Sequence, residues 1–351
     1  IDDQLADLPV DEEPLPANIH DALTQIIDLE EVKKHKTYGV DDAILTGKLS
    51  EAKILPDKMY AYSGNENGSL NIVCNNILIA GFTDKGLRGY NEDGIFVDAD
   101  SETLMVTDGV GSSGSGEVCS NIGIHVLAQL LKKVRDGEMK MFDMAELPTF
   151  LHRAVIEYKE NNEKYKRTGA TMVAAQVHDD KTVEFVHAGD STAMLIRGLE
   201  VVWENEPDNG YQFLKENRDM SEAEIDEMYE RINERDIDEG GKGNSTPEGL
   251  VQSLGQQPSF IDFKKGIQSD DILNGKHHTE QAQKGDIILL CSDGLTKTIG
   301  SEEVAKFIDE RHQQGMALNR IAEELKEELK KRWNNGEGSI DNVTVLLAEI
   351  K

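Results

Sequence analysis

The sequence predicts an α+β fold in which two antiparallel sheets pack on each other and helices cover their outer faces. Strand-like and helix-like segments follow one another as strands, two helices, strands, helices and a final strand, without the regular alternation of a parallel α/β sheet. In addition, three strand-like runs within 170–198 are separated only by short turns, which is typical of an antiparallel meander.

The first 70 residues are predicted to be an acidic, partly helical N-terminal extension. Residues 1–18 are acidic and contain several prolines, and residues 19–35 have the apolar spacing of a helix. The turn-rich stretch 63–69 marks the boundary, so the main domain is expected to span 71–351. The extension is open to three interpretations: a regulatory segment, a docking arm, or an extra pair of strands on the sandwich.

Apolar or β-branched runs bounded by Gly, Asn and Asp predict the strands of the main domain. These runs cover residues 75–83, 94–98, 103–108, 170–178, 182–189, 192–198, 286–294 and 341–350. Helical spacing of apolar residues predicts helices at 116–136, at 145–166 and within 301–333. A polar insertion at about 204–249 contains a further charged helix, predicted from Ser221 to Asp236.

The composition restricts the partners of the chain. It has 37 basic and 67 acidic residues, a net charge of −30, which repels the phosphate backbone of nucleic acids. Such a surface attracts basic protein segments and divalent metal ions, or it only keeps the chain in solution. The three cysteines form no paired motif, and no apolar run approaches the roughly 20 residues that cross a membrane. We therefore expect a cytoplasmic protein that binds neither nucleic acid nor membranes; its oligomeric state is not predicted.

The stretch VTDGVGSSGSGE, residues 106–117, contains the spacing G-x-G-x-x-G that is found in dinucleotide-binding turns. Such a site also requires a second parallel strand after the helix and an acidic residue at the end of that strand. Here the next segment is another helix, and Asp136, which has the right spacing, follows a helix. The glycines are therefore not interpreted as a nucleotide site.

Acidic residues at the ends of apolar strands give a different prediction. Each of them stands beside a Gly or Asn that suits a tight turn: Glu92, Asp93, Asp108, Asp293 and Asp341. One Asp-Gly pair is usually only a turn, but several carboxylates gathered without a matching Lys or Arg repel one another, and divalent cations relieve that repulsion. Oxygen ligands without clusters of Cys or His favour Mg²⁺ or Mn²⁺ over Zn²⁺.

Seven motifs, in this order, resemble the metal-dependent protein phosphatase 2C family in its bacterial form. They are RGYNED, VTDGVG with a following GE, TGATMV, HAGDSTAMLI, QSLGQQPSF, GDIILLCSDGL and DNVTVLL, and they cover about 71–351. The resemblance implies an αββα sandwich and a hydrolase of phosphoserine and phosphothreonine in proteins. It also implies that two Mn²⁺ or Mg²⁺ ions hold between them the water or hydroxide that attacks phosphorus.

The resemblance assigns a role to each residue of the acidic set. Asp108 would bridge the two ions, the Gly109 carbonyl would bind the second ion, and Asp293 and Asp341 would complete the first. Glu92 would serve the second ion directly or through water, and Asp93 would hold metal-bound waters. Arg88 matches the arginine that binds the substrate phosphate, for which its planar fork is suited.

The chain departs from the family at two positions of this site. Val110 stands where many members carry a histidine that could act as general acid, and Lys166 stands where some members carry an aspartate that binds a third metal ion. A third metal is therefore not expected in that form. Asp190, within HAGDS, is interpreted as a structural residue that holds a turn between strands.

The insertion at 204–249 takes the place of the family's flap, which borders the active site. Its acidic helix predicts a preference for basic phosphopeptides, although a merely solvated helix explains the same charges. Two alternatives to the phosphatase remain: an inactive pseudophosphatase that acts as a binding or scaffold module, and a hydrolase of small phosphoesters.

Overall fold

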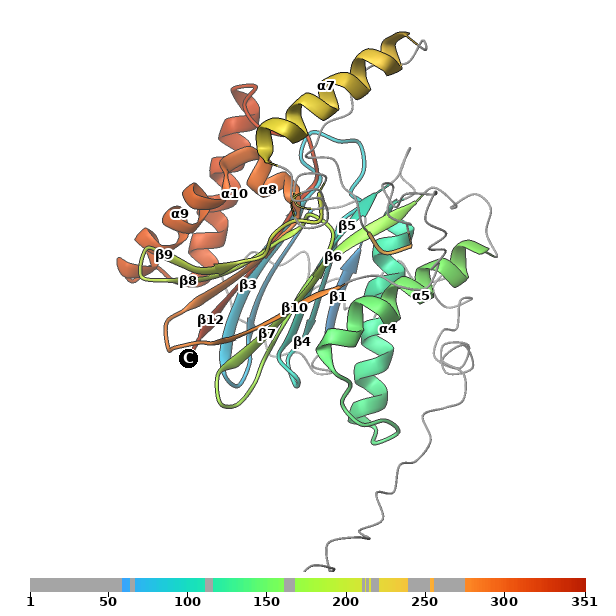
Figure 1. Cartoon of the computed structure of the whole chain (residues 1–351). Helices are drawn as coiled ribbons and strands as arrows, with labels where there is room; N and C mark the ends of the chain where they lie inside the picture. The colour runs from blue at the N-terminus through green and yellow to red at the C-terminus, as the bar shows by residue number, and fades with distance from the viewer. Residues whose placement is uncertain are drawn as a thin grey trace, which may run out of the picture.

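The structure is a computed structural model that describes residues 59–63, 67–110, 116–160, 168–209, 212, 215, 221–238, 253–255 and 275–351. Two six-stranded antiparallel sheets lie face to face, and helices cover both outer faces (Figure 1). This arrangement confirms the predicted αββα sandwich.

The first sheet contains, in spatial order, β1 (Met59–Ser63), β4 (Gly94–Asp98), β5 (Thr103–Val110), β6 (Gly169–Val177), β7 (Thr182–Ala188) and β10 (Lys276–Gln281). The second sheet contains β2 (Gly68–Val73), β3 (Ile77–Asp84), β12 (Val343–Ile350), β11 (Ile287–Cys291), β8 (Thr192–Arg197) and β9 (Glu200–Glu204). Each pair of neighbouring strands is antiparallel, as predicted.

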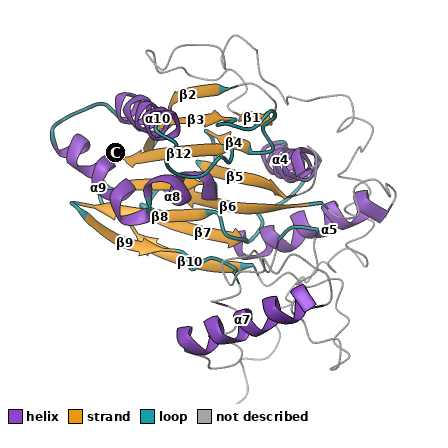
Figure 2. Cartoon of the chain, turned by 90° about the horizontal axis from the view of Figure 1, so that it is seen from above, coloured by secondary structure: helices purple, strands orange, loops and turns teal. Residues whose placement is uncertain are grey.

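The helices divide between the two outer faces, as the view from above shows (Figure 2). The first sheet is covered by α4 (Gly116–Arg135) and α5 (Leu147–Glu160), which follows the short 3-10 helix η1 (Met144–Glu146). The second is covered by α8 (Asp293–Ile299), α9 (Ser301–Gln313) and α10 (Leu318–Asn334). The helix of the insertion, α7 (Glu222–Asp238), lies higher than the sheets in Figure 1 and beyond the β10 edge of the sandwich in Figure 2. No helix among the described residues is long and apolar enough to cross a membrane.

Three layers of apolar side chains hold the sandwich together. One lies between α4, α5 and the first sheet, one between the two sheets, and one between the second sheet and α8–α10. All nine residues of the central strand β6 are buried, because the strand is covered on both faces. Two such faces, with the hydrophobic effect acting on each, fix the positions at which the strands end.

The meander predicted for 170–198 is wrong for its third strand. β6 and β7 pair with each other, but β8 crosses to the second sheet, where it pairs with β11 and β9. Gly189, with φ of +110°, makes the crossing, and Ser191 and Thr192 are buried behind it. A short connection therefore joins two sheets here rather than two neighbours in one sheet.

Three short elements were not predicted: β9, β10 and α8. β1 and β2 correspond to one of the three interpretations of residues 1–70, extra strands on the sandwich, although each joins a different sheet. β1 and half of β2 lie within the range 1–70 that the sequence assigns to an extension, yet they pair with β4 and β3 of the sandwich. The described sandwich thus begins at Met59, and residues 1–58 lie outside the described part. Strand β10 consists of alternating exposed and half-buried polar residues, so it carries no apolar pattern.

Candidate metal centre

The antiparallel sheets bring the predicted carboxylates to one end of the sandwich. Asp93 directly precedes β4, and Asp108 lies near the end of β5, which pairs with β4. Asp293 follows β11, and Asp341 lies two residues before β12, the partner of β11. Because neighbouring strands run in opposite directions, the end of one and the start of the next lie at the same edge. This is the end at which α8 begins (Figure 1).

Asp93 is fully buried, and it links the two sheets. The Ser292 hydroxyl donates to Asp93 Oδ2 over 2.8 Å and accepts from the Thr344 amide over 2.9 Å. The other oxygen, Oδ1, is buried and accepts no hydrogen bond from any described residue. Burial raises the pKa of Asp93 to about 7; the neighbouring Thr344 and Ser292 hydroxyls lower it, and the charges of Asp341 and Asp293 raise it further.

Glu92 fastens the start of α4 to the site. Its Oε1 accepts from the Gly116 amide over 2.7 Å, and its backbone carbonyl accepts from the Ser120 hydroxyl and from the Gly109 amide. A Cβ at Gly109 would lie 2.7 Å from the Glu92 carbonyl and 2.4 Å from Gly116, so only glycine fits this approach. Burial raises the pKa of Glu92, which the Gly116 amide partly offsets.

Asp293 carries an ion pair that the sequence analysis did not foresee. Its Oδ2 contacts the ammonium of Lys297, one turn later on α8, whereas its Oδ1 is buried and accepts no hydrogen bond from a described residue. Gly294 lies against the backbone of Asn342, where a Cβ would be 2.0 Å from the carbonyl oxygen. This close approach joins the start of α8 to the segment that carries Asp341.

Arg88 lies between two of the predicted metal ligands. Its Nη2 is 2.8 Å from Asp341 Oδ1, and its Nη1 is 3.6 Å from Glu92 Oε2. The Asn342 side chain holds this loop: it accepts from the Glu92 amide and donates to the carbonyls of Lys85 and Tyr90. Burial and the charge of Asp293 raise the pKa of Asp341, and Arg88 lowers it. The expectation of carboxylates without a matching basic residue is therefore wrong on both sides of the site, since Arg88 and Lys297 are present.

Asp108 and Asp190 complete the acidic group. The Asp108 amide donates to the Thr171 hydroxyl, which also bonds to the Ser191 hydroxyl beside Asp190. Burial and then the charges of Asp93 and Asp293 raise the pKa of Asp108 well above its ordinary value. Burial and the charge of Asp293 raise the pKa of Asp190 to about 7. Asp190 thus follows a turn between strands, and its carboxylate is also a member of the acidic group.

The donor set fits divalent metal ions. Two buried carboxylate oxygens without a hydrogen-bond donor, on Asp93 and Asp293, belong to one group of like charges, an arrangement that costs free energy unless a cation lies between them. The group offers oxygen and no sulfur or imidazole, which suits Mg²⁺ or Mn²⁺. Among the described residues, however, no group of three or more His, Cys, Asp or Glu side chains is arranged so that it could hold a metal ion.

Two residues of this site were missed by sequence reasoning. Lys297 was not noticed because α8 was not predicted, and only a helix starting at Asp293 puts residues 293 and 297 on one face. Asp190 was given only a structural role. Of the predicted loop glycines, Gly111 and Gly114 lie outside the described residues, as does Lys166.

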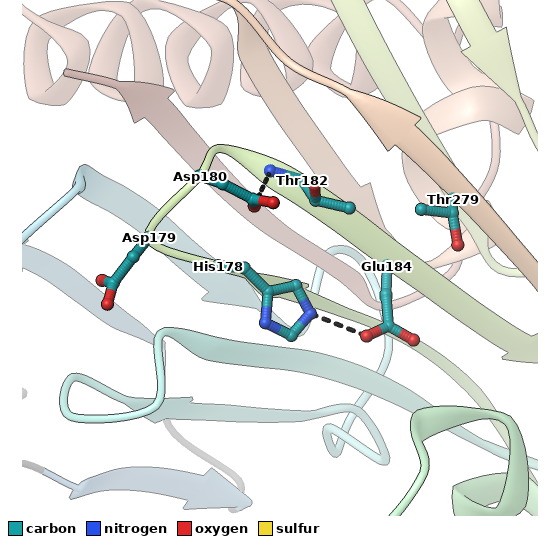
Figure 3. A pocket seen from close by; sticks show the side chains of 6 residues that line it. All are labelled: His178, Asp179, Asp180, Thr182, Glu184 and Thr279. Carbon is teal, nitrogen blue, oxygen red and sulfur yellow. Dashed lines mark hydrogen bonds and ion pairs between the residues drawn. The ribbon is translucent and has the colours of Figure 1, made fainter.

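A shallow pocket lies at the opposite end of the first sheet, around the turn between β6 and β7 (Figure 3). Glu184 lies there between His178 and His277, with 2.7 Å and 2.8 Å between the Nε2 atoms and the carboxylate oxygens. Asp180 accepts from the Thr182 amide over 2.9 Å. These hydrogen bonds occupy the acidic groups, so the pocket offers no uncompensated carboxylate of the kind found beside Asp108.

Comparison with known proteins agrees with the site. The sequence pattern of the protein phosphatase 2C family matches residues 89–330. The serine/threonine protein phosphatase PstP of Mycobacterium tuberculosis is 26% identical over 272 residues, which are 76% of this chain and 44% of PstP. The serine/threonine phosphatase stp of Listeria monocytogenes is 24% identical over 280 residues, 76% of this chain and 93% of stp. The chain thus spans less than half the length of PstP and nearly all of stp.

A solved structure shares the fold. The catalytic domain of PstP in complex with two manganese ions superposes with a TM-score of 0.55 and 23% identity, over 78% of this chain and 98% of that domain. The chain thus has the fold of an αββα sandwich with a group of carboxylates at one end. Because the family pattern matches more than half of its residues, the chain belongs to the protein phosphatase 2C family.

Proposed function

We propose that this chain is a serine/threonine protein phosphatase that hydrolyses phosphoserine and phosphothreonine with the help of two divalent metal ions. The observation that carries the proposal is the pair of buried carboxylate oxygens without a donor, on Asp93 and Asp293, within a group that belongs to both sheets. Family membership and the names of the relatives, which are serine/threonine phosphatases, support the reaction class.

The metal ions would be held by Asp108, the Gly109 carbonyl, Asp293, Asp341 and, directly or through water, Glu92. Bound ions supply a water of lowered pKa and neutralise charge on the phosphoryl oxygens. Manganese in the PstP structure supports Mn²⁺ as one such ion, and the oxygen ligands suit Mg²⁺ equally.

The protein side chains would orient the phosphoester and accept protons around it. Arg88 is positioned to exchange a carboxylate partner for the substrate phosphate, since its side chain is 35% exposed and its fork suits two phosphate oxygens. Asp93, held by Ser292 at Oδ2, keeps Oδ1 available to accept a proton from water. Val110 supplies no proton, so protonation of the leaving group falls to water.

The substrate class would be phosphoproteins with basic residues near the phosphate. Helix α7 lies on the side of the carboxylate end in Figure 1 and beyond β10 in Figure 2, and it buries Ile225 and Tyr229. Its exposed acidic side chains are Glu222, Glu224, Asp226, Glu227 and Glu230. Ser221 and Glu224 form a reciprocal capping box that fixes the start of this helix.

The test of the reaction is release of phosphate from a phosphothreonine peptide with Mn²⁺, with EDTA, and with Asp293→Asn. Release that requires Mn²⁺ and is lost in both controls supports the proposal. Binding of Mn²⁺ without any release would favour the inactive scaffold protein. Release from p-nitrophenyl phosphate but from no phosphopeptide would favour the hydrolase of small phosphoesters.

The test of the substrate class compares two phosphothreonine peptides, one flanked by Arg and one by Glu. We expect a higher kcat/KM for the basic peptide, reduced about threefold by the double change Asp226→Asn and Glu230→Gln, because each removes one negative charge from α7. Equal kcat/KM for both peptides would contradict the preference.

A further inference from the structure

Lys297 lies inside the acidic group rather than at its edge. It is four residues after Asp293 on α8, and its ammonium contacts Asp293 Oδ2. The Lys297 side chain is 50% exposed and that of Asp293 only 12%, so the lysine reaches inward from the surface to a buried carboxylate. A flexible four-carbon stem of this kind can change partners without any movement of the helix.

The charge of Lys297 acts on several carboxylates at once. Burial works to lower the pKa of Lys297, but Asp293, followed by Asp190 and Asp108, outweighs it and raises that pKa. Lys297 in turn lowers the pKa of Asp190 and of Asp341.

In this structure the predicted metal ligands are engaged by the protein's own cations. Asp293 is paired with Lys297, and Asp341 and Glu92 are paired with Arg88. This pairing is consistent with the lack of a converged ligand shell within the described ranges. A divalent ion that binds Asp293 competes with Lys297 for the same carboxylate, and two cations at one carboxylate repel each other.

We propose that Lys297 is an exchangeable counter-ion of the metal centre: it pairs with Asp293 in the metal-free protein, and an arriving divalent ion displaces it from that carboxylate. The inference rests on the proposed metal-dependent function. Lys297 thereby stabilises the metal-free fold and weakens metal binding, because binding includes the loss of an ion pair. It is a positioning residue for Asp293 and not a metal ligand.

The experiment measures Mn²⁺ binding by calorimetry on the full chain after removal of metal with a chelator. We expect Lys297→Met, which keeps the length of the side chain without its charge, to tighten Mn²⁺ binding about tenfold. Lys297→Arg keeps the charge. Its Mn²⁺ affinity is expected to stay within about threefold of the wild type, because the ion pair with Asp293 is retained. Lys306→Met is the matched control, since Lys306 forms an exposed i,i+4 pair with Glu310 on α9, outside the acidic group, and it should leave affinity unchanged.

Thermal unfolding tests whether the metal ion displaces Lys297 from Asp293 or only binds near the charge of Lys297. Lys297→Met is expected to lower Tm by about 2–4 °C in EDTA and not in saturating Mn²⁺, because the ion pair exists only in the metal-free state. An equal fall in both conditions, or unchanged Mn²⁺ affinity, would overturn the inference. Failure of the wild type itself to bind Mn²⁺ would instead contradict the proposed function.

Discussion

Strand β11 carries a buried aspartate at each end, and the two aspartates differ in their hydrogen bonds. Asp286, just before the strand, is 2% exposed, and Asp293, just after it, is 8% exposed. Asp286 is satisfied: Arg197 donates to both of its oxygens, at 2.9 and 2.6 Å, and the Gln283 amide donates at 2.8 Å. Asp293 has a single partner, Lys297, and one buried oxygen without a donor.

Strand β4 repeats the contrast. Asp98 at its end receives hydrogen bonds from the Arg135 side chain and from the Ser101 hydroxyl. Asp93 at its start receives one from Ser292, and its Oδ1 has no donor among the described residues. Burial alone therefore does not separate a structural carboxylate from a functional one. In β11 and β4 the two kinds of aspartate differ instead in whether both carboxylate oxygens accept hydrogen bonds from described residues, and that difference leads to four predictions.

The largest effect is expected for Asp293→Asn. Phosphate release with saturating Mn²⁺ should fall more than about 100-fold, because even residues that only orient a metal ligand cost 10–100-fold when they are changed. Tm in EDTA should fall by no more than the change expected for Lys297→Met, since loss of the ion pair with Lys297 is offset by removal of a buried charge. Activity and Tm measured on the same preparation test both parts; a larger fall of Tm in EDTA would show that Asp293 is needed for folding.

For Asp286→Asn we expect a loss of stability without a change in Mn²⁺ affinity. Loss of the charge breaks a forked ion pair with Arg197, whose side chain is 33% exposed, and the free energy of unfolding should fall by about 2 kcal/mol after allowance for that exposure. Denaturant titration measures this loss. Mn²⁺ affinity should not change, and weaker Mn²⁺ binding would show that the two ends of β11 are coupled.

The raised pKa values of two carboxylates in the acidic group also predict that stability depends on pH. In the metal-free chain the pKa of both Asp93 and Asp190 is raised to about 7, from 3.8 for an ordinary aspartate. The folded chain therefore binds more protons than the unfolded chain between these values, and its free energy of unfolding falls as pH rises from about 4 to about 7.

Thermal unfolding in EDTA across that pH range measures the slope. Asp93→Asn should make it shallower, whereas Asp98→Asn, at the satisfied end of β4, should leave it unchanged even though it destabilises the fold. Saturating Mn²⁺ should remove the fall in stability, because the ion keeps the carboxylates charged. The same slope in the wild type and in Asp93→Asn would contradict the raised pKa.

These contrasts also show what the sequence can and cannot reveal. Asp93, Asp108, Asp293 and Asp341 could be predicted to gather, because each follows or precedes an apolar strand beside a turn residue, and antiparallel pairing brings such ends together. Those positions depend on local patterns, which the sequence contains. The difference between these aspartates and Asp98 or Asp286 does not depend on local patterns. It depends on partners far along the chain, such as Arg197 for Asp286.

The missed elements have the same physical origin. β9 and β10 are short edge strands with alternating exposure, and β10 has only polar residues, so pairing with β8 and β7 is what makes them strands. The crossing of β8 to the second sheet depends on one glycine turn, and its alternative, a third strand in a meander, has the same sequence pattern. α8 is only seven residues long and follows a strand directly, so its helical period is too short to detect.

The smallest effect is expected where the site is held by one hydroxyl. Ser292→Ala removes the hydrogen bond that the Ser292 hydroxyl donates to Asp93 Oδ2 and takes away the acceptor of the Thr344 amide, so the free energy of unfolding should fall by about 1–2 kcal/mol. Mn²⁺ affinity, measured by calorimetry, should weaken about threefold, because Asp93 then orients water less well. Ser101→Ala is the matched control, since Ser101 donates to Asp98 over the same 2.8 Å at the other end of β4. It should cost similar stability and leave Mn²⁺ affinity unchanged. Equal Mn²⁺ affinity in both variants would mean that Ser292 contributes only to the stability of the fold. Asp93 Oδ1 would then act without help from the hydrogen bond at Oδ2.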